Sequence, residues 1–514
     1  HIAYLKFNEK KVKEFSLWYY KNDLYPDEFK FKYPKAGEDN SKVTAHIVTV
    51  KTGKSTLINL SDYEYIPRLT WSGTSNQLVL LTLNRHQNHL RYHLYDLTSK
   101  KASLKVFYEE RSSTYVEIDD NLQVLNDGKS VLRTSEADGY NHLYRLHFDG
   151  TQQQITTGKW DVMDLYGIDA KNEFIYYSSV ENGAITKFIY KIKADGNGKT
   201  LISGPAGYNE ADFTTGMNYF VKYHSTANSP ALISLCDNSG KMIRVLENNE
   251  ALNTKLAGLN LGEKEFMTFN MGDYSLNAWM IKPANFDPSK KYPVYMVVYG
   301  GPGHNEVIDS WGGANYMYHQ LLAQKGYIVV SVDPRGTMYR GAEFKKSTYL
   351  QLGKLETEDL ILTGKQLQKL PFVDADRIGI QGWSYGGFMS SLAITKGADV
   401  YKMAIAVAPV TNWKFYDNIY TERFMRTPKE NESGYNDNSP TNFAHLLKGK
   451  YLLIHGSGDD NVHYQNSMEM ISALVKANKQ FDLFIYPNKN HGIYGGNTRN
   501  HLFNMIHQYI IVEL

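Results

Sequence analysis

The stretch Arg377-Ile378-Gly379-Ile380-Gln381-Gly382-Trp383-Ser384-Tyr385-Gly386-Gly387 decides the fold of the second half of this chain. It contains the pattern Gly-x-Ser-x-Gly, which alone is weak, because it arises by chance in roughly one chain in five of this length. Its context is more specific: an apolar strand runs directly into the pattern, and a helix is expected from Gly386 onward. A sharp turn between strand and helix exposes the serine hydroxyl at the sheet edge, and glycines are expected where such a turn leaves no room for a Cβ.

Outward from this stretch, buried-type strands alternate with amphipathic helices from about residue 256 onward. The expected strands are 294–299, 327–332, 377–381, 402–407, 451–455 and 482–486. The expected helices lie near 314–325, 355–370, 386–397, 464–478 and 497–512. A hairpin at 265–270 and 274–282, followed by a loop at 283–291, precedes them. Continuous apolar strands that alternate with helices are typical of a doubly wound, mostly parallel sheet.

Residues 1 to about 255 have a different period, with short strands separated by tight turns. Turns near 53, 99, 150, 196 and 240 recur every 44 to 51 residues, and a second series near 73, 128, 171 and 216 lies between them. Two turns per repeat imply about four strands per repeat, which is the pattern of a β-propeller blade. The alternative is an all-β sandwich with evenly spaced turns. About five repeats are present, and the first is incomplete.

The sequence therefore predicts an α/β-hydrolase domain at 256–514, preceded by the C-terminal blades of a β-propeller at 1–255. The segment His1–Phe7 alternates like a strand already under way, without an initiator Met or a leader. Because propellers close on themselves to protect their sheet edges, we expect an N-terminally truncated propeller whose first blades lie upstream.

Length and composition limit the classes of function. A chain of 514 residues is too long for a single hydrophobic core. Its net charge of +2 gives no electrostatic reason to expect a nucleic-acid partner or an anionic membrane surface. No apolar run reaches the ~18 residues of a membrane span. The single cysteine, Cys236, follows an expected strand at 231–235 and is predicted to be a buried structural thiol.

No pattern favours a metal or another cofactor. His89 and His93 have the spacing H-x-x-x-H, in a stretch interpreted as strand or turn. On a strand, four residues span about 13 Å, which is too far for one ion. We therefore predict no metal and no cofactor.

Two side chains beyond Ser384 complete a candidate catalytic triad. On this fold the chain order is serine, acid, histidine. Asp459 follows the expected strand 451–455, and His491 lies in the loop after strand 482–486. Asp460 remains an alternative acid by position, although a turn-stabilising role suits it as well. The other late histidines, His501 and His507, fall on the last expected helix and are weaker candidates for the base.

The oxyanion of a tetrahedral intermediate needs hydrogen-bond donors. One should be the backbone N–H of Tyr385, the residue after the candidate nucleophile. A second candidate is the hydroxyl of Tyr299, in the loop Tyr299-Gly300-Gly301-Pro302-Gly303 that closes an early strand. By pattern alone, Tyr299 is equally well explained as a packing tyrosine.

Three stretches resemble the dipeptidyl peptidase IV branch of the prolyl oligopeptidase family of serine peptidases. They are 382–387, 407–413 running on to Tyr416, Tyr420 and Arg423, and 459–463. The resemblance implies Asp459 as the acid and Tyr299 as the side-chain oxyanion donor. It also implies a pocket for the residue before the scissile bond, lined by Tyr385, Val410, Trp413, Tyr416, Tyr420 and Val462, with Asn461 on the preceding carbonyl. Without the resemblance, we would interpret Trp413, Tyr416 and Tyr420 as the core stripe of one helix.

The activity implied is that of a serine exopeptidase that releases N-terminal Xaa-Pro, and less well Xaa-Ala, dipeptides through an acyl-enzyme. The alternatives are a prolyl tripeptidyl peptidase or oligopeptidase of the same family, and a non-catalytic propeller scaffold. The glutamate pair that binds the substrate ammonium in such enzymes would lie upstream of His1, and we interpret Glu109-Glu110 as an exposed loop pair. The resemblance further implies peptide substrates, a homodimer and a periplasmic, cell-surface or secreted location.

Overall fold

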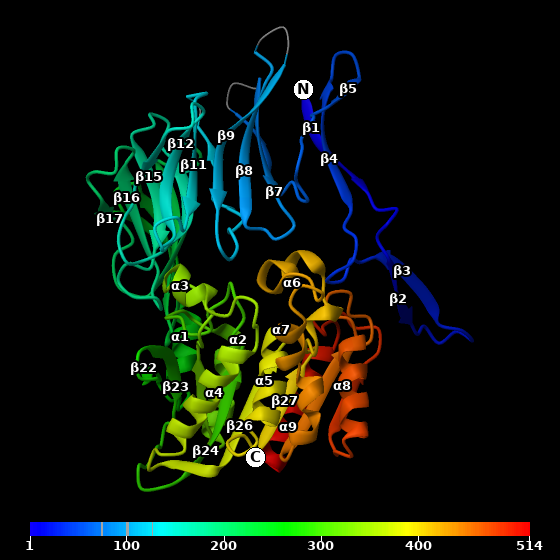
Figure 1. Ribbon diagram of the computed structural model, residues 1–514. Helices are drawn as coiled ribbons and strands as arrows, with labels where there is room; N and C mark the ends of the chain where they lie inside the picture. The colour runs from blue at the N-terminus through cyan, green and yellow to red at the C-terminus, as the bar shows by residue number, and fades with distance from the viewer. Residues whose placement is uncertain (73–75, 99–101, 126) are drawn as a thin grey trace.

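The computed structural model describes residues 1–72, 76–98, 102–125 and 127–514, and its first half is built from separate antiparallel sheets (Figure 1). Four of these sheets have four strands each, in the orders β6-β7-β8-β9, β10-β11-β12-β13, β14-β15-β16-β17 and β18-β19-β20-β21. A fifth sheet, β1-β4-β5, has three strands. Each four-stranded sheet is one consecutive run of chain, as in propeller blades. The predicted five repeats with an incomplete first one are confirmed, and the sandwich alternative is wrong.

The strands of this first half are short. Their bounds are β1 Ile2–Asn8, β4 Lys42–Thr49, β5 Lys54–Leu57, β6 Leu69–Trp71, β7 Gln77–Leu83, β8 His89–Asp96, β9 Ser103–Arg111, β10 Gln123–Val124, β11 Ser130–Ser135, β12 His142–His147, β13 Gln152–Gln154, β14 Val162–Ile168, β15 Phe174–Ser179, β16 Phe188–Lys193, β17 Thr200–Leu201, β18 Tyr208–Phe213, β19 Tyr219–Thr226, β20 Ser229–Asp237 and β21 Met242–Glu247. Gly150 and Gly240, at two of the predicted turns, have φ of +97° and +88°, which favours glycine. The predicted turns near 73 and 99 fall outside the described residues.

The hairpin β2 (Glu14–Tyr19) and β3 (Asp27–Lys32) was not predicted as a separate element. It interrupts the first sheet between β1 and β4 and extends away from the propeller toward the second half of the chain (Figure 1). There the ring of Phe15 stacks on His463 at 3.5 Å between centroids, and the backbone N–H of Tyr20 donates to Asn488 at 2.8 Å. The hairpin therefore contacts loops of the hydrolase half.

The second half is one eight-stranded sheet, in the order β22-β23-β25-β24-β26-β27-β28-β29. The strands are β22 Lys264–Asn270, β23 Ser275–Ile281, β24 Tyr292–Val298, β25 Ile328–Val332, β26 Val373–Trp383, β27 Met403–Val407, β28 Lys450–Gly456 and β29 Asp482–Tyr486. All pairs from β25 to β29 are parallel, whereas β22 and β23 are antiparallel. The predicted doubly wound, mostly parallel sheet is confirmed, with a hairpin at its edge.

The five predicted helices are present, and two apolar clusters cover the two faces of the sheet. The helices are α2 Gly313–Gln324, α4 Lys354–Leu367, α5 Tyr385–Lys396, α8 Gln465–Lys476 and α9 Thr498–Glu513. Shorter elements were not predicted, because six to eight residues carry too little periodicity. These are α1 Glu250–Ala257, α3 Gly341–Lys346, α6 Asn418–Met425, α7 Glu432–Asp437 and two 3₁₀ segments at Trp413–Phe415 and Pro440–Leu446. The boundary that we propose between the two domains, 255/256, falls within α1.

Candidate active site

The turn that carries Ser384 lies between β26 and α5. Ser384 has φ 60° and ψ −116°, a strained conformation for a residue with a side chain. A Cβ on Gly382 would lie 2.1 Å from the backbone of Gly386, and a Cβ on Gly386 would lie 2.2 Å from the carbonyl oxygen of Val298. Both glycines are therefore required by close backbone approach, as the sequence predicted. The turn leaves Ser384 partly exposed at the C-terminal ends of the parallel strands.

Asp459 and His491 form the best-defined pair at this sheet edge. Asp459 follows β28, His491 follows β29, and Nδ1 of His491 lies 2.7 Å from Oδ2 of Asp459. Asp459 is fully buried, whereas Asp460 is exposed. The carbonyl of His491 accepts a hydrogen bond from the indole of Trp383 at 3.0 Å, so the histidine loop is fastened to the residue just before Ser384.

The surroundings of Asp459 keep it ionised. Burial alone would raise its pKa, but hydrogen bonds from His455 and His491 outweigh burial and hold the pKa below its ordinary value. The backbone N–H groups of Asn461 and Val462 also donate to its Oδ1, at 3.0 and 2.9 Å. A carboxylate held in this way can fix the tautomer and orientation of an imidazole. His455, whose Nε2 lies 3.1 Å from Asp459, was not singled out from the sequence.

Tyr299 and Tyr385 meet above the start of α5. Their ring centroids are 5.9 Å apart, and Gly301 lies between them, since a Cβ there would lie 2.8 Å from carbons of both rings. Burial raises the pKa of Tyr299, and Glu306 adds to the effect, so its hydroxyl stays protonated and able to donate. The backbone N–H of Tyr385 belongs to the first turn of α5, where such groups have no partner within the helix.

The six residues predicted to line a pocket belong to one apolar cluster, although they do not share a helix. Trp413 begins a 3₁₀ segment, Tyr416 follows it in extended backbone, and Tyr420 lies on α6. The helix-stripe interpretation of these three residues is therefore wrong. The Trp413 and Tyr420 rings stack at 5.8 Å, and the Tyr416 and Tyr420 rings meet edge to face at 5.5 Å. Tyr385, Val410 and Val462 are buried in the same cluster.

Asn461 joins this aromatic group to the propeller half. Its side-chain oxygen accepts a hydrogen bond from Tyr416 at 2.7 Å, and its backbone oxygen accepts one from Tyr33 at 2.8 Å. The N–H of Ala36 also donates to the carbonyl of Tyr416 at 3.1 Å. Sequence reasoning missed Tyr33 and Ala36, because no short-range pattern connects them with residues some 400 positions away.

Comparisons with known proteins place the chain in a family. A model of the prolyl oligopeptidase family matches residues 315–513, and a model of the dipeptidyl peptidase IV N-terminal region matches residues 1–231. Dipeptidyl peptidase 4 of Trichophyton equinum is 31% identical over 96% of this chain and 67% of its own length. The crystal structure of Porphyromonas gingivalis dipeptidyl peptidase 4 is 40% identical, with a TM-score of 0.95 over 100% of this chain and 73% of that chain. The chain belongs to the prolyl oligopeptidase family.

Several relatives are much longer than this chain. The probable dipeptidyl-aminopeptidase B of Arthroderma benhamiae is 31% identical over 99% of this chain but only 59% of its own length. The chain thus spans about 60% of the length of the first curated relatives that it matches. Residues 315–513, which the prolyl oligopeptidase family model matches, include Ser384, Asp459 and His491.

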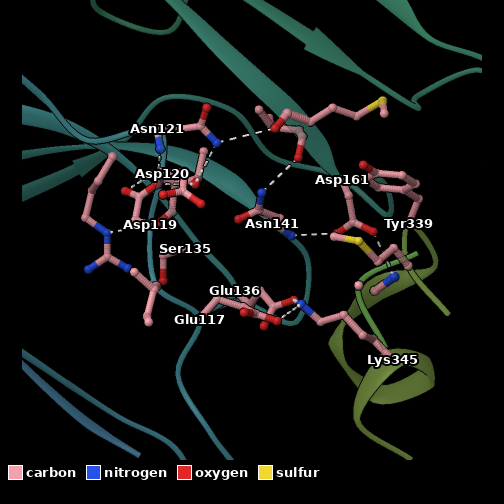
Figure 2. Close-up of a pocket in the computed structure, with 18 of the residues that line it drawn as sticks. Glu117, Asp119, Asp120, Asn121, Ser135, Glu136, Asn141, Asp161, Tyr339 and Lys345 are labelled. Atoms are coloured by element: carbon pink, nitrogen blue, oxygen red, sulfur yellow. Dashed lines mark hydrogen bonds and ion pairs between the residues drawn. The ribbon is translucent and has the colours of Figure 1, made fainter. Parts of the chain in front are cut away.

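A polar cavity of about 270 Å³ lies where the propeller meets the prolyl oligopeptidase domain (Figure 2). Gly303, from the loop that follows Tyr299, is part of its wall. Figure 2 shows Asp161 beside Tyr339, and Lys345 pointing to Glu117 and Glu136. Carboxylates outnumber cations in the lining, so the cavity differs in character from the aromatic group around Trp413.

The interpretation of Glu109-Glu110 as a loop pair is wrong, although Glu109 is exposed as expected. Both lie on β9, where Glu109 contacts His89, while Glu110 binds Arg133 and accepts a hydrogen bond from Ser135. Their partners are side chains of neighbouring strands, which supply a structural explanation for both carboxylates.

The remaining predictions concern metals, the cysteine and membrane spans. His89 and His93 both lie on β8, where His93 contacts Thr82. Within the described ranges there is no group of three or more His, Cys, Asp or Glu placed to hold a metal ion. Cys236 is buried on β20. The described part of the chain has no helix with both the length and the apolar character needed to cross a bilayer.

Proposed function

We propose that this chain carries the catalytic machinery of a serine exopeptidase that releases N-terminal Xaa-Pro dipeptides, and Xaa-Ala dipeptides less well. The observation that carries the proposal is the 2.7 Å contact between His491 and Asp459, in a loop fastened to the strained turn at Ser384. A strained serine, in a turn fastened to the loop of a histidine that a buried carboxylate orients, suits an activated nucleophile.

The reaction follows from the roles of three side chains. Ser384 Oγ attacks the carbonyl carbon of the residue before the scissile bond, while Nε2 of His491 takes the hydroxyl proton. His491 then gives that proton to the leaving amine, which departs and leaves an ester on Ser384. Water, deprotonated by His491, attacks the ester, and the dipeptide carboxylate leaves as the serine hydroxyl re-forms. Asp459 holds the imidazole and stabilises its cation throughout.

The tetrahedral oxyanion would be held by two donors from different elements. The N–H of Tyr385 comes from α5, and the hydroxyl of Tyr299 comes from the loop after β24. The loss of one such donor typically costs about 10²–10³ in rate. The position of Gly301 supports this assignment, because only a residue without a Cβ fits between the two rings and lets the two tyrosines lie close together.

Proline suits the aromatic pocket that we assign to the residue before the scissile bond. A compact apolar ring packs well on the faces and edges of Trp413, Tyr416 and Tyr420, and Val410 and Val462 limit the size of the pocket. Asn461, next to Tyr416, would bind the carbonyl of the preceding residue.

The test is hydrolysis of Gly-Pro-p-nitroanilide by the full-length protein. Ser384→Ala should lower kcat by about 10⁴-fold or more, whereas Ser433→Ala, at an exposed serine on α7, should leave kcat unchanged. Equal activity of the wild type and Ser384→Ala would remove Ser384 from the mechanism.

Two rival functions have separate tests. A tripeptidyl peptidase or oligopeptidase would release Ala-Ala-Pro from a peptide that begins with this sequence, which mass spectrometry detects. A non-catalytic scaffold would show no labelling by a fluorophosphonate in the folded full-length protein. Labelling at Ser384 with release of Xaa-Pro alone would exclude both rivals.

A homodimer and a periplasmic, cell-surface or secreted location also remain proposals. The dimer is supported by β29, the last strand in the order of the sheet, and by exposed apolar side chains on the helices that follow β28 and β29 in the chain. These side chains are Met468 and Val475 on α8 and Ile511 and Val512 on α9. Light scattering with Val475→Glu tests the dimer, because a charge there should favour the monomer.

A further inference from the structure

A fully buried carboxyl group lies under the proposed oxyanion site, on a helix to which the mechanism assigns no role. Glu356 is in the first turn of α4, and its side chain is 0% exposed. One oxygen accepts a hydrogen bond from the hydroxyl of Tyr385 at 2.7 Å, and the other accepts the backbone N–H of Gly353 at 3.0 Å. The carboxyl group therefore connects the start of α4 to the first residue of α5.

Tyr385 contributes to the proposed site through both its backbone and its ring. Its backbone N–H is the proposed oxyanion donor, and its ring packs on Trp413 at 5.3 Å and on Tyr299 at 5.9 Å. Gly301 touches this ring so closely that a Cβ would lie 2.8 Å from its Cγ. A shift of the Tyr385 ring would therefore disturb the packing of Tyr299, which carries the other proposed oxyanion donor, and one wall of the pocket.

We propose that Glu356 is a positioning residue for the oxyanion site, which acts through the hydroxyl of Tyr385 and does not touch the substrate. The inference rests on the proposed serine-peptidase function and adds a residue to its machinery. Glu356 fixes the outer end of the ring, while the backbone of Ser384 and Tyr385 fixes the inner end. With both ends held, the Tyr385 N–H and the Tyr299 hydroxyl keep their positions before substrate arrives.

The competing explanation is that Glu356 only caps α4, because its bond to the Gly353 N–H would stabilise any helix start. The packing here is tight, since a Cβ on Gly353 would lie 2.4 Å from the ring of Phe388. A cap would affect folding but not the chemical step. The two explanations are separated by the Tyr385 hydroxyl, which has no part in the cap.

The same helix contains a matched control. Asp359, one turn further along α4, is also fully buried and accepts a hydrogen bond from the hydroxyl of Tyr274 at 2.5 Å. Arg335 contacts this carboxylate at 2.8 Å. Tyr274 precedes β23 at the edge of the sheet, away from the Ser384 turn. Tyr274→Phe therefore removes a buried tyrosine–carboxylate bond from α4 without disturbing Tyr385.

The experiment compares five variants of the full-length protein: Tyr385→Phe, Glu356→Ala, the double variant of these two, Glu356→Gln and the control Tyr274→Phe. Glutamine keeps an oxygen that can accept from Tyr385 but has none left for the Gly353 N–H. Three quantities are measured for each variant: kcat and KM with Gly-Pro-p-nitroanilide, the rate of phosphonylation by a fluorophosphonate, and the melting temperature.

We expect Tyr385→Phe and Glu356→Ala each to lower kcat and the phosphonylation rate about tenfold, with KM changed less than threefold. A displaced donor has this effect, because the oxyanion forms only in the reaction. The double variant should be no slower than the slower single variant, since both single variants remove the same bond between Tyr385 and Glu356. Glu356→Gln should regain at least a third of wild-type kcat while its melting temperature stays low. Tyr274→Phe should lower the melting temperature and leave kcat unchanged.

The proposal is overturned if Tyr385→Phe and Glu356→Ala lower the melting temperature but leave kcat and the phosphonylation rate within twofold of the wild type. Additive losses in the double variant would also overturn it, because the two groups would then act separately. If the wild type hydrolyses no Xaa-Pro substrate, the proposed function fails by itself. The phosphonylation rates then still decide the role of Glu356 at Ser384.

Discussion

The two halves of the molecule are stabilised in different ways, and the proposed active site depends on both. In the hydrolase half, two large apolar clusters cover the faces of one continuous sheet. In the propeller half, smaller clusters fill the spaces between neighbouring sheets. The hydrolase sheet therefore fixes Ser384, Asp459 and His491 against one another through a shared core. In the described part of the propeller, the sheets have two to four strands each, so none matches the eight-stranded sheet that carries these three residues.

Contacts between the halves include several buried ion pairs. Lys345 and Lys346 on α3 reach Glu117 and Glu136 of the propeller, and Arg85 of the propeller reaches Glu422 on α6. Buried charges of this kind give less net stability than apolar contacts of the same size, but losing one partner is expensive. The comparison thus predicts that the hydrolase core determines the rate of the chemical step. The charged junction determines how the propeller side of the site is positioned.

The largest expected effect comes from Lys345→Met at this junction. The Lys345 side chain is 6% exposed, and its ammonium group lies 2.7 Å from Glu117 and 2.5 Å from Glu136. Its removal leaves two carboxylates short of a partner, which should cost about 3–5 kcal/mol in the free energy of unfolding. Urea unfolding followed by tryptophan fluorescence measures the change.

The control is Lys448→Met, which breaks an exposed pair of similar length. Lys448 lies 2.9 Å from Asp399, and both side chains are more than half exposed. An exposed ion pair contributes about 0–1 kcal/mol, so this variant should unfold almost like the wild type. Equal losses in the two variants would contradict the idea that burial makes the junction important.

The sequence predicted the hydrolase half more completely than the junction, for a physical reason. The turn at Ser384 follows from local rules, since its glycines are required by backbone contacts within a few residues or with the adjacent strand. The choice of Asp459 over Asp460 needed the resemblance, but the fold order already limited it to one loop. The turn at Ser384 and the loop of Asp459 could be predicted because each depends on residues that are close together in the sequence.

Several missed contacts join residues that are far apart in the sequence. The contacts of Glu356 with Tyr385 and of Arg85 with Glu422 join positions 29 and 337 residues apart. The β2–β3 hairpin was missed because nothing local shows that it leaves the propeller. Glu109 and Glu110 were interpreted as a loop pair, whereas both lie on β9 and their partners come from other strands.

A smaller effect, confined to the hydrolase core, is a pH dependence of stability that originates at Glu356. Burial raises the pKa of this carboxyl from about 4.5 to about 7, although the hydrogen bond from Tyr385 opposes the rise and Asp359 adds to it. The folded protein therefore holds a proton that the unfolded chain releases between pH 4.5 and 7. The stabilising contribution of this group is largest at low pH, falls by up to about 3 kcal/mol across that window, and is constant above it.

Glu356→Gln should remove this contribution to the pH dependence. Urea unfolding of the wild type and the variant at pH 5 and pH 8 gives the difference directly. Asp333, another buried carboxyl whose pKa burial raises to about 7, is present in both proteins, so its contribution cancels. An identical pH dependence in the two proteins would mean that Glu356 is ionised throughout, which would contradict the effect of its burial.

The smallest expected effect concerns how the propeller aligns the pocket. Arg85 makes two hydrogen bonds of 2.7 Å to the carboxylate of Glu422, which is 1% exposed and lies on the same helix as Tyr420. Arg85→Met should let α6 shift and raise KM for Gly-Pro-p-nitroanilide about tenfold, equivalent to about 1.4 kcal/mol. Because α6 does not carry Ser384, Asp459 or His491, kcat should change less than threefold.

The control for this prediction is the neighbouring residue, His86, which forms an exposed contact. His86 contacts Glu430 at 2.7 Å, but both side chains are more than one third exposed, so His86→Ala should leave KM and kcat unchanged. If Arg85→Met instead lowered kcat with KM constant, the propeller would be acting on the oxyanion site and not on the pocket. We assigned the chemical step to the hydrolase core and the alignment of the substrate to the charged junction. That assignment would then be wrong, because a junction contact would control the chemical step.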